Sequence, residues 1–218
     1  MKKTTAIALI LIVLSTCLFA LDISEINAFD RLQVHRYNTE LDKTATALEI
    51  AAMLTPAVLL GEEPNQYVTI GVMYLETQLL TWGTTELFKH AIDRPRPYMY
   101  YDNPPQAKVD SGDWNNSFPS GHTAMSFAGA SFASYVFWKY NPDSKWRIPV
   151  TAASYSLAAT VAVLRVAGGN HFMTDVLAGA LLGTAIGIGV PALHNLLADK
   201  DAAVSVSPFG LVFSMSYN

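Results

Sequence analysis

Five long apolar segments, separated by short polar stretches, restrict the fold of this chain more than any other feature of its sequence. They cover residues 45–60, 67–85, 123–138, 149–164 and 176–193, and the last three contain no Asp, Glu, Lys or Arg. Segments of this length suit helices far better than strands. Because 51% of the residues are hydrophobic and 15% are charged, a disordered chain is excluded. We therefore expect an all-α helical bundle of about five to six core helices that spans a membrane or borders on one.

The charged residues and the single cysteine exclude several classes of protein. The formal net charge is −4 and no stripe of Lys or Arg runs along the sequence, so we expect no binding of nucleic acid. Cys17 is the sole cysteine, which excludes an intramolecular disulfide and a thiolate metal site. Lys139, Lys145 and Arg147 share one short loop, as is typical of a loop on the cytoplasmic side of a membrane.

The first twenty residues have the pattern of an export signal. A basic start at 1–3 precedes an apolar run at 6–19, and Ala20 provides a cleavage point. One alternative is an uncleaved first membrane segment, for which the run is short. Another is lipidation at Cys17. We expect the chain to reside in the cell envelope.

Three smaller patterns complete the outline of the chain. Gly179, Gly183 and Gly187 recur at four-residue spacing in the last apolar segment, which lets another helix approach that face closely. Residues 203–217 alternate between apolar and polar side chains, which predicts a short β-hairpin. The apolar residues of 22–43 have the spacing of a short amphipathic helix or arm.

Three polar clusters lie at the ends of apolar segments. They cover residues 89–97, 115–123 and 164–175. The first follows the second apolar segment, the second precedes the third segment, and the third joins the last two segments. Because consecutive helices of an up-and-down bundle run in opposite directions, we expect all three clusters at the same end of the bundle.

All three clusters offer positive charge to an anion. Ser120 can cap a helix that starts at the second cluster, and Gly121 lets an anion approach the free N–H groups of its first turn. Lys89, Arg96 and Arg165 supply three cations. This set suits a phosphoryl group, whose negative charge is spread over three oxygens.

The third cluster contains a histidine and a carboxylate. His171 and Asp175 are four residues apart, so on a helix the carboxylate can accept a hydrogen bond from the imidazole and make its other nitrogen a better nucleophile or base. Each cluster alone also fits a structural role: a helix cap with an exposed His122, a structural His–Asp pair, or a rigid surface loop around Arg96. Their expected coincidence at one end of the bundle favours a functional site.

The combined pattern resembles the type 2 phosphatidic acid phosphatase (PAP2) superfamily, which includes acid phosphatases and vanadium haloperoxidases. The match consists of three motifs with the family's spacing: Lys89 to Arg96-Pro97, then Pro119-Ser120-Gly121-His122, then Arg165 to His171 to Asp175. The departure from the pattern is Leu164, which stands where the family has Ser.

The resemblance implies a role for each matching residue. His171 attacks phosphorus to form a phosphohistidine, Asp175 orients His171, and His122 protonates the leaving oxygen and then deprotonates water. Five further residues would hold the phosphoryl oxygens: Lys89, Arg96, Ser120, Gly121 and Arg165. No metal ion and no cofactor is implied, because the cationic side chains and the helix N-terminus supply the positive charge.

The resemblance also implies an organisation and an activity. A PAP2-like phosphatase domain would cover 21–200, after a signal peptide or membrane segment at 1–20 and before a tail or hairpin at 201–218. Its substrate would be a lipid phosphate monoester or diphosphate, and its site would face the periplasm from a bacterial inner membrane. The alternatives are a soluble periplasmic acid phosphatase of broad specificity, a vanadium haloperoxidase and a non-catalytic lipid-binding bundle.

Overall fold

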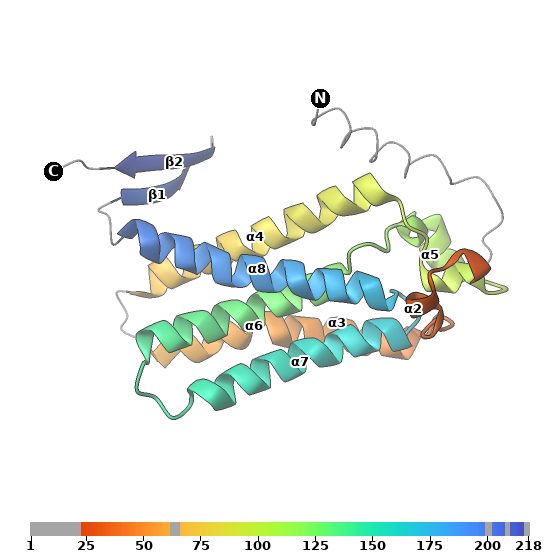
Figure 1. The fold of residues 1–218 in the computed structure, drawn as a ribbon, viewed down its shortest axis with the longest axis horizontal. Coiled ribbons are helices and arrows are strands. Elements are labelled where there is room, and N and C mark those ends of the chain that lie inside the picture. The colour runs from red at the N-terminus through yellow and green to blue at the C-terminus, as the bar shows by residue number, and fades with distance from the viewer. Residues whose placement is uncertain (1–22, 62–65, 199–201, 208–209, 216–218) are drawn as a thin grey trace.

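Five long helices form a bundle in the part of the chain that the computed structural model describes, which comprises residues 23–61, 66–198, 202–207 and 210–215 (Figure 1). Their bounds are α3 Thr39–Met53, α4 Tyr67–Ile92, α6 Gly121–Tyr140, α7 Arg147–Ala167 and α8 Met173–Ala198. Each apolar segment of the sequence overlaps one of these helices. The predicted all-α bundle is therefore confirmed.

The first long helix, α3, lies further towards the N-terminus than its apolar segment. It begins at Thr39 because the Asn38 side chain accepts hydrogen bonds from two of the free N–H groups at its start. It ends at Met53, and the chain continues as the 3-10 helix η2, Thr55–Gly61. The carboxylates of its first turns are thereby brought to the end of the bundle where the polar clusters meet.

The second long helix, α4, extends beyond its apolar segment. It continues to Ile92, where Asp93 adopts a left-handed conformation with φ of 47° and ends the helix. Lys89 therefore lies in the last turn of α4 rather than in a loop.

Shorter elements connect the long helices and extend the chain on either side of them. They are the 3-10 helices η1 Ile23–Glu25, η4 Pro97–Tyr100 and η5 Asp113–Asn115, the helices α2 Ala28–Arg31 and α5 Gln106–Asp110, and the strands β1 Ala202–Ser207 and β2 Gly210–Met215. The two strands pair antiparallel beyond α8. The predicted signal segment at 1–20, with Cys17, lies outside the described residues.

Helix α6 packs most closely against α8, at the three glycines spaced four apart. A Cβ atom at Gly183 would lie 2.1 Å from the carbonyl oxygen of Ala124, and one at Gly187 would lie 2.6 Å from that of Ala128. Any larger residue would force the helices apart. The glycine pattern therefore brings the starts of α6 and α8 together, where two of the polar clusters lie.

The interior of the bundle contains many small and hydroxyl-bearing residues. They include Thr77, Thr81 and Thr85 of α4 and Ala124, Ser126, Ala128 and Ser131 of α6. A cluster of larger apolar side chains joins η2, α4 and α6: Leu59, Ile70, Met73, Phe132, Val136 and Phe137. The buried threonine hydroxyls of α4 donate to carbonyl oxygens one turn earlier in the same helix, so they need no partner elsewhere.

Large apolar side chains lie on the outside of the bundle. Val68 and Leu87 of α4, Ile148 and Val163 of α7 and Leu181 of α8 are each more than 60% exposed. Among the described residues, two helical stretches are long and apolar enough to cross a membrane, 147–167 and 173–197. An apolar exterior around an interior of small residues is typical of helices packed in lipid.

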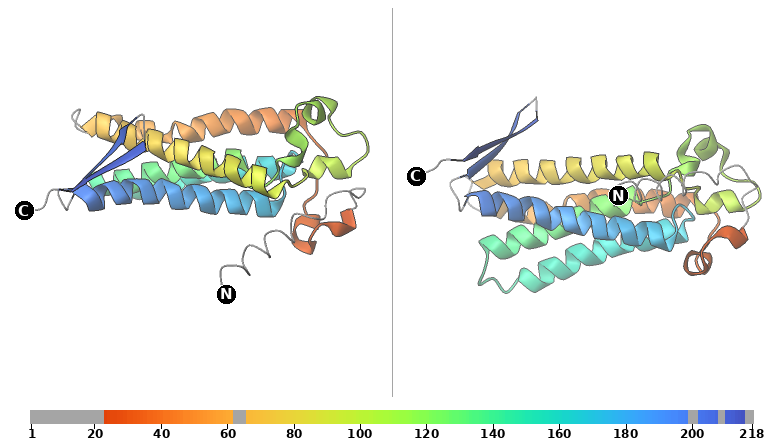
Figure 2. Two further views of the ribbon diagram at one scale, coloured as in Figure 1. Left: turned by 90° about the horizontal axis from the view of Figure 1, so that it is seen from above. Right: turned by 45° about the horizontal axis from the view of Figure 1, so that its top comes forward.

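The ends of the helices lie as the sequence predicts. Helix α4 ends, α6 begins, α7 ends and α8 begins at the same end of the bundle, which also carries α2 and α5 (Figure 1). The turned views in Figure 2 show the long helices running along a common axis, with the connection between α4 and α6 at that end. The three polar clusters therefore share one end.

Candidate active site

Backbone hydrogen bonds hold the three polar clusters against one another. The N–H of Ser117 donates to the carbonyl oxygen of Arg94 at 3.0 Å, which joins the second cluster to the first. The N–H of Ser120 donates to the carbonyl oxygen of Asp175 at 3.0 Å, which joins the second cluster to the third. The main chain thus fixes the relative positions of segments that are far apart in the sequence.

His171 lies in the loop between α7 and α8 and is almost fully buried. Its Nδ1–H donates to the carbonyl oxygen of Ser117 at 2.8 Å, and its Nε2 accepts a hydrogen bond from Arg96 Nη1 at 3.0 Å. Burial holds the pKa of His171 well below its usual 6.5, and the charges of Arg96 and Arg165 lower it further. The imidazole is therefore neutral, with its lone pair on Nε2.

Asp175 supports His171 less directly than the sequence predicts. Its Oδ2 lies 3.7 Å from His171 Nδ1, too far for a hydrogen bond. The physical reason is that His171 precedes Met173, the first residue of α8, so the two residues do not share a helical face. Asp175 Oδ2 instead accepts hydrogen bonds from Ser117 Oγ at 2.6 Å and from the N–H of Phe172 at 2.8 Å. The predicted direct hydrogen bond is wrong, because Asp175 holds Ser117 and Ser117 holds the imidazole.

Arg96 is held along its whole guanidinium group. Its Nε donates to the carbonyl oxygen of Asp113 and its Nη2 pairs with Asp113 Oδ1, both at 2.6 Å. Its Nη1 donates to the carbonyl oxygen of Asn170 at 3.1 Å as well as to His171. With 4% of its surface exposed, Arg96 is a fixed cation beside the lone pair of His171.

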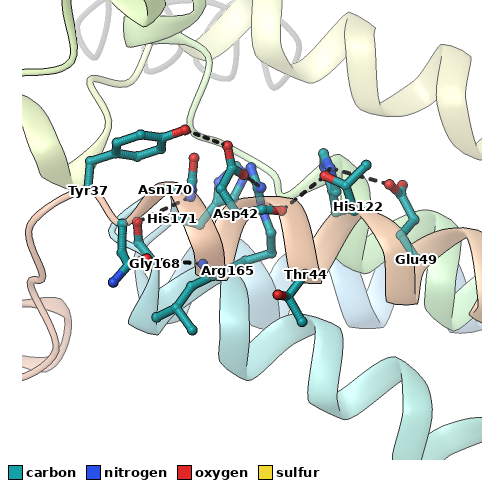
Figure 3. Close-up of polar contacts among 12 residues, drawn as sticks. Tyr37, Asp42, Thr44, Glu49, His122, Arg165, Gly168, Asn170 and His171 are labelled. Carbon is teal, nitrogen blue, oxygen red and sulfur yellow. Dashed lines mark hydrogen bonds and ion pairs between the residues drawn. The ribbon is translucent and has the colours of Figure 1, made fainter.

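Arg165, in the last turn of α7, provides a second buried cation. Its Nη1 forms an ion pair with Asp42 of α3, and Asp42 also accepts a hydrogen bond from the Tyr37 hydroxyl at 2.8 Å (Figure 3). The Nε of Arg165 is buried and has no hydrogen-bond partner among the described residues. Because a buried donor without a partner costs free energy, this N–H suits a bound anion.

The start of α6 adds the positive end of a helix. Ser120 caps α6 as predicted: its Oγ accepts hydrogen bonds from the N–H of Thr123 at 3.5 Å and from its hydroxyl at 3.0 Å. Lys89 Nζ lies 3.4 Å from the position that a Cβ atom of Gly121 would take. Because Gly121 has no side chain, an anion beside it can contact both the ammonium group of Lys89 and the N-terminus of α6.

His122 is the second residue of α6, and its ring lies against α3 (Figure 3). Its Nε2 is 3.1 Å from Thr46 Oγ1 and 3.3 Å from Glu49 Oε2. Burial lowers the pKa of His122 below its usual 6.5, and Arg165 lowers it further. Since Arg165 lowers the pKa of His171 as well, both imidazoles border on the same cationic region.

All eight residues singled out in the sequence lie at this end of the bundle. They are Lys89, Arg96, Ser120, Gly121, His122, Arg165, His171 and Asp175. Leu164, the departure from the family pattern, has a half-buried side chain, and its carbonyl oxygen accepts a hydrogen bond from the N–H of Gly168 at 2.8 Å.

Sequence reasoning missed four acidic residues that contact arginines or the second imidazole at this end of the bundle. They are Asp30 of α2, Asp42 and Glu49 of α3 and Asp113 of η5. Asp30 is fully buried, pairs with Arg94 at 2.7 Å and accepts a hydrogen bond from the N–H of Thr174 at 2.9 Å. No local spacing marks such carboxylates, because each one meets a partner on a different element of the fold.

The arrangement offers a neutral imidazole lone pair, two buried guanidinium groups, an ammonium group, a helix N-terminus and a second imidazole. No group of three or more His, Cys, Asp or Glu among the described residues is arranged to hold a metal ion. Such a set of groups suits nucleophilic displacement at an oxyanion such as a phosphoryl group.

Comparison with known proteins agrees with this chemistry. Residues 67–198 match the PAP2 superfamily. The chain is 32% identical over 123 residues to "Probable diacylglycerol pyrophosphate phosphatase 1" of Schizosaccharomyces pombe, which covers 46% of this chain and 44% of that protein. It is 32% identical over 128 residues to "Lipid phosphate phosphatase 1" of Arabidopsis thaliana, which covers 50% and 39%. The matched region is thus less than half the length of either relative.

One solved structure is similar over nearly its whole length. It is the crystal structure of a transmembrane PAP2-type phosphatidylglycerolphosphate phosphatase from Bacillus subtilis, with a TM-score of 0.50 and 23% sequence identity. The superposition covers 89% of this chain and 96% of that one. The two chains therefore share a helical-bundle fold.

Proposed function

Since the chain belongs to the PAP2 superfamily, we propose that it hydrolyses a lipid phosphate, as a monoester or a diphosphate, through a phosphohistidine and without a metal ion. The observation that carries this proposal is the buried His171, whose Nε2 lone pair faces Arg96 while its Nδ1–H is held by Ser117. A neutral imidazole fixed in this tautomer beside a buried cation suits attack on an anionic phosphoryl group.

The cationic groups bind the phosphoryl oxygens. Arg96 and Arg165 approach from the side of His171, and the free Nε–H of Arg165 donates to one oxygen. Lys89 and the first N–H groups of α6 approach from the opposite cluster. Together they neutralise the charge that the transition state spreads over three oxygens.

The reaction then proceeds in two steps. His171 Nε2 forms a bond to phosphorus as the bond to the leaving oxygen breaks, and His122 gives a proton to that oxygen. In the second step His122 takes a proton from water, the water oxygen attacks phosphorus, and the bond between phosphorus and His171 breaks. Inorganic phosphate leaves, and both histidines regain their starting states.

A lipid is the proposed substrate because of the outer surface of the bundle. The exposed apolar side chains of α4, α7 and α8 suit contact with acyl chains, and two helical stretches have the length and hydropathy to cross a bilayer. The names of the relatives describe diacylglycerol pyrophosphate and lipid phosphates as substrates. These observations support a phosphate group carried on a membrane lipid.

We place the site on the periplasmic face of a bacterial inner membrane. Lys139 lies in the last turn of α6 and Arg147 begins α7, at the end of the bundle opposite the site. Basic residues in such a loop favour the cytoplasmic side. Two of the cations at the site end, Arg96 and Arg165, are buried in ion pairs.

Trapping of the phosphoenzyme tests the proposal. Purified protein in detergent with EDTA is mixed with ³²P-labelled phosphatidate and with labelled phosphatidylglycerolphosphate, and quenched within one turnover. We expect an acid-labile, base-stable label on the wild type and none on His171→Ala. His90→Ala is the matched control, because His90 is exposed and its Nδ1 forms a hydrogen bond with the carbonyl oxygen of Glu86 in its own helix.

Three results would contradict parts of the proposal. Equal labelling of the wild type and His171→Ala refutes the nucleophile. Activity that appears only after Mg²⁺ is added refutes metal independence. Hydrolysis of soluble phosphomonoesters, with no release of phosphate from the lipids, refutes the substrate class and supports an acid phosphatase of broad specificity.

A further inference from the structure

A half-buried carboxylate of α3, Glu49, faces the second imidazole of the site. Its Oε2 lies 3.3 Å from Nε2 of His122, and its side chain is 15% exposed. Figure 3 shows Glu49 reaching His122 from the turn of α3 that faces the start of α6. Because α3 precedes the region that matches the superfamily, residues 67–198, no motif of the sequence points to Glu49.

Thr46 helps to identify the nitrogen of His122 that carries a fixed hydrogen. The Thr46 hydroxyl donates to the carbonyl oxygen of Asp42 at 3.1 Å, so its oxygen accepts from His122 Nε2 at 3.1 Å. Nε2–H thus points at two acceptors, Thr46 Oγ1 and Glu49 Oε2. This leaves Nδ1 as the ring nitrogen that exchanges a proton with a substrate.

The charged groups around Glu49 and His122 affect the protonation of His122. The groups that face Glu49 and His122 from other elements or turns are Asp42 of α3, Lys89 of α4, Arg96 after α4, Arg165 of α7 and His171 before α8. Most of these charges are positive and disfavour an imidazolium at His122. A carboxylate beside Nε2 acts in the opposite direction and favours a second proton on His122.

We propose that Glu49 is a positioning residue for His122, which holds its Nε2–H and stabilises the imidazolium that protonates the leaving oxygen. This inference rests on the proposed function. During formation of the phosphohistidine, the Nδ1 proton of His122 moves to the leaving oxygen and the imidazole becomes neutral. During hydrolysis, Nδ1 takes a proton from water and the imidazolium forms again. Once the substrate is bound, Glu49 remains a carboxylate in both steps.

The pKa directions of the two groups set the starting state of the pair. Burial raises the pKa of Glu49 to about 7, although Arg165 and Lys89 act in the opposite direction, and burial lowers the pKa of His122. Near neutral pH the pair without substrate therefore takes up its proton on Glu49 rather than on His122. A phosphate dianion that binds beside His122 favours the state with this proton on the imidazole.

Glu49→Gln tests the proposal, because glutamine keeps the shape of the side chain without its charge. Glu40→Gln is the matched control, since Glu40 is an exposed residue in the first turn of the same helix. With phosphatidate at neutral pH, we expect Glu49→Gln to lower kcat about 10- to 100-fold with less than about a threefold change in KM. We expect Glu40→Gln to resemble the wild type.

Two further measurements, one with a different leaving group and one across pH, distinguish a positioning role of Glu49 from a structural role. Nitrophenolate leaves without a proton, so the first-turnover burst from p-nitrophenyl phosphate should fall less than about threefold in Glu49→Gln. The alkaline limb of kcat/KM with phosphatidate should move to lower pH by about one unit or more, because the imidazolium loses its carboxylate. Glu49→Asp keeps the charge, so the alkaline limb of its kcat/KM profile should lie at a pH close to that of the wild type.

A double-mutant cycle covers the case in which Glu49→Gln is destabilised. In the His122→Ala background, Glu49→Gln should cause no further loss of p-nitrophenyl phosphate hydrolysis. Three results would overturn the role of Glu49. They are equal loss of activity with phosphatidate and p-nitrophenyl phosphate, an alkaline limb at the same pH as in the wild type, and additive losses of activity in the double-mutant cycle. A wild type that releases no phosphate from either substrate instead overturns the proposed function on which it rests.

Discussion

Ser117 links the two parts of the site that were expected to touch directly. Its carbonyl oxygen accepts the Nδ1–H of His171, and its hydroxyl donates to Asp175. Asp175 is further paired with Arg94, whose guanidinium lies 4.2 Å from the ring centre of Phe172. The orientation of the nucleophile thus depends on a chain of three groups rather than on a single hydrogen bond.

We predict that Asp175→Asn slows the chemical step and leaves substrate binding nearly intact. The change weakens the hydrogen bond from the Ser117 hydroxyl and leaves the cations that bind phosphate unchanged. We expect kcat with phosphatidate to fall about 100-fold and KM to change less than about threefold. Steady-state kinetics in mixed micelles measure both constants, and unchanged turnover would count against the orienting role.

Ser117→Ala is the matched variant for this chain of contacts. It removes the hydroxyl that donates to Asp175 but keeps the carbonyl oxygen that holds His171. If Asp175 acts through Ser117, the double variant loses less activity than the product of the two single losses. Independent, multiplicative losses would show that Asp175 reaches His171 by another route.

At the scale of helices, the spacing of α6 and α8 sets the site. The backbones touch at the glycines of α8, and the site lies at the starts of the same two helices. Ser120 at the start of α6 donates its N–H to Asp175 at the start of α8. A change in the spacing of the helices is therefore transmitted to the groups that surround His171.

We predict that Gly183→Ala destabilises the protein, because its Cβ atom would lie 2.1 Å from a carbonyl oxygen of α6. We expect the free energy of unfolding to fall by about 3 kcal/mol. Gly189→Ala on the same helix is the control: nothing lies within 4 Å of its Cβ position, and helix propensity favours the change by up to about 1 kcal/mol. Thermal unfolding in detergent compares the two, and equal melting temperatures would contradict the close packing of α6 and α8.

Helix α2 is attached to the site through Asp30. This carboxylate accepts hydrogen bonds from Asn27, Arg94 and Thr174. Burial raises the pKa of Asp30, but the hydrogen bonds from Thr174, Arg94 and Asn27 outweigh burial, so the pKa is lower than its usual 3.8. The resulting stability is present above pH 3.8 and is lost as the pH falls through the lower value of the folded protein.

We predict that Asp30→Asn lowers the free energy of unfolding by about 3 kcal/mol at neutral pH, because Arg94 loses a buried partner. As the pH falls through the folded-state pKa of Asp30, the wild type loses the same charge and the difference between the two proteins shrinks. Thermal unfolding of both proteins from pH 7 downwards measures this difference. A gap in melting temperature that stays constant with pH would refute the contribution of the ionised carboxylate.

At the scale of the whole molecule, the distribution of side-chain sizes differs from that in a water-soluble bundle. Alanine, serine and threonine fill much of the interior, while leucine, valine and isoleucine lie on the outside of α4, α7 and α8. In lipid, apolar side chains gain little from burial, and close packing of small residues holds helices together.

We predict that the protein stays in the membrane fraction of cells. Washing with alkaline carbonate or with high salt should not release it, whereas a mild detergent should, because its exposed apolar surface needs an apolar solvent. Immunoblotting of the supernatant and pellet follows the protein, with a periplasmic soluble protein as the control for lysis. Recovery in the carbonate supernatant would end the spanning model and favour the soluble periplasmic alternative.

The sequence by itself determined the features that depend on neighbouring residues. Apolar segments predicted five helices, Ser120 was identified as the N-cap of α6, and the alternation of helix directions predicted one end for all three polar clusters. These are consequences of helical periodicity, of local capping and of short connections. The glycine spacing likewise predicted a close helix contact, although not that α6 would be the partner.

Only the tertiary structure decided which groups hold the functional side chains. Asp42 meets Arg165, Glu49 meets His122, and Ser117 stands between His171 and Asp175. These partners come from different helices or from the loops between them, so their meeting depends on helix packing and loop paths rather than on spacing along the chain. A carboxylate on α3 has no local property that distinguishes it until the bundle places a buried cation or imidazole beside it.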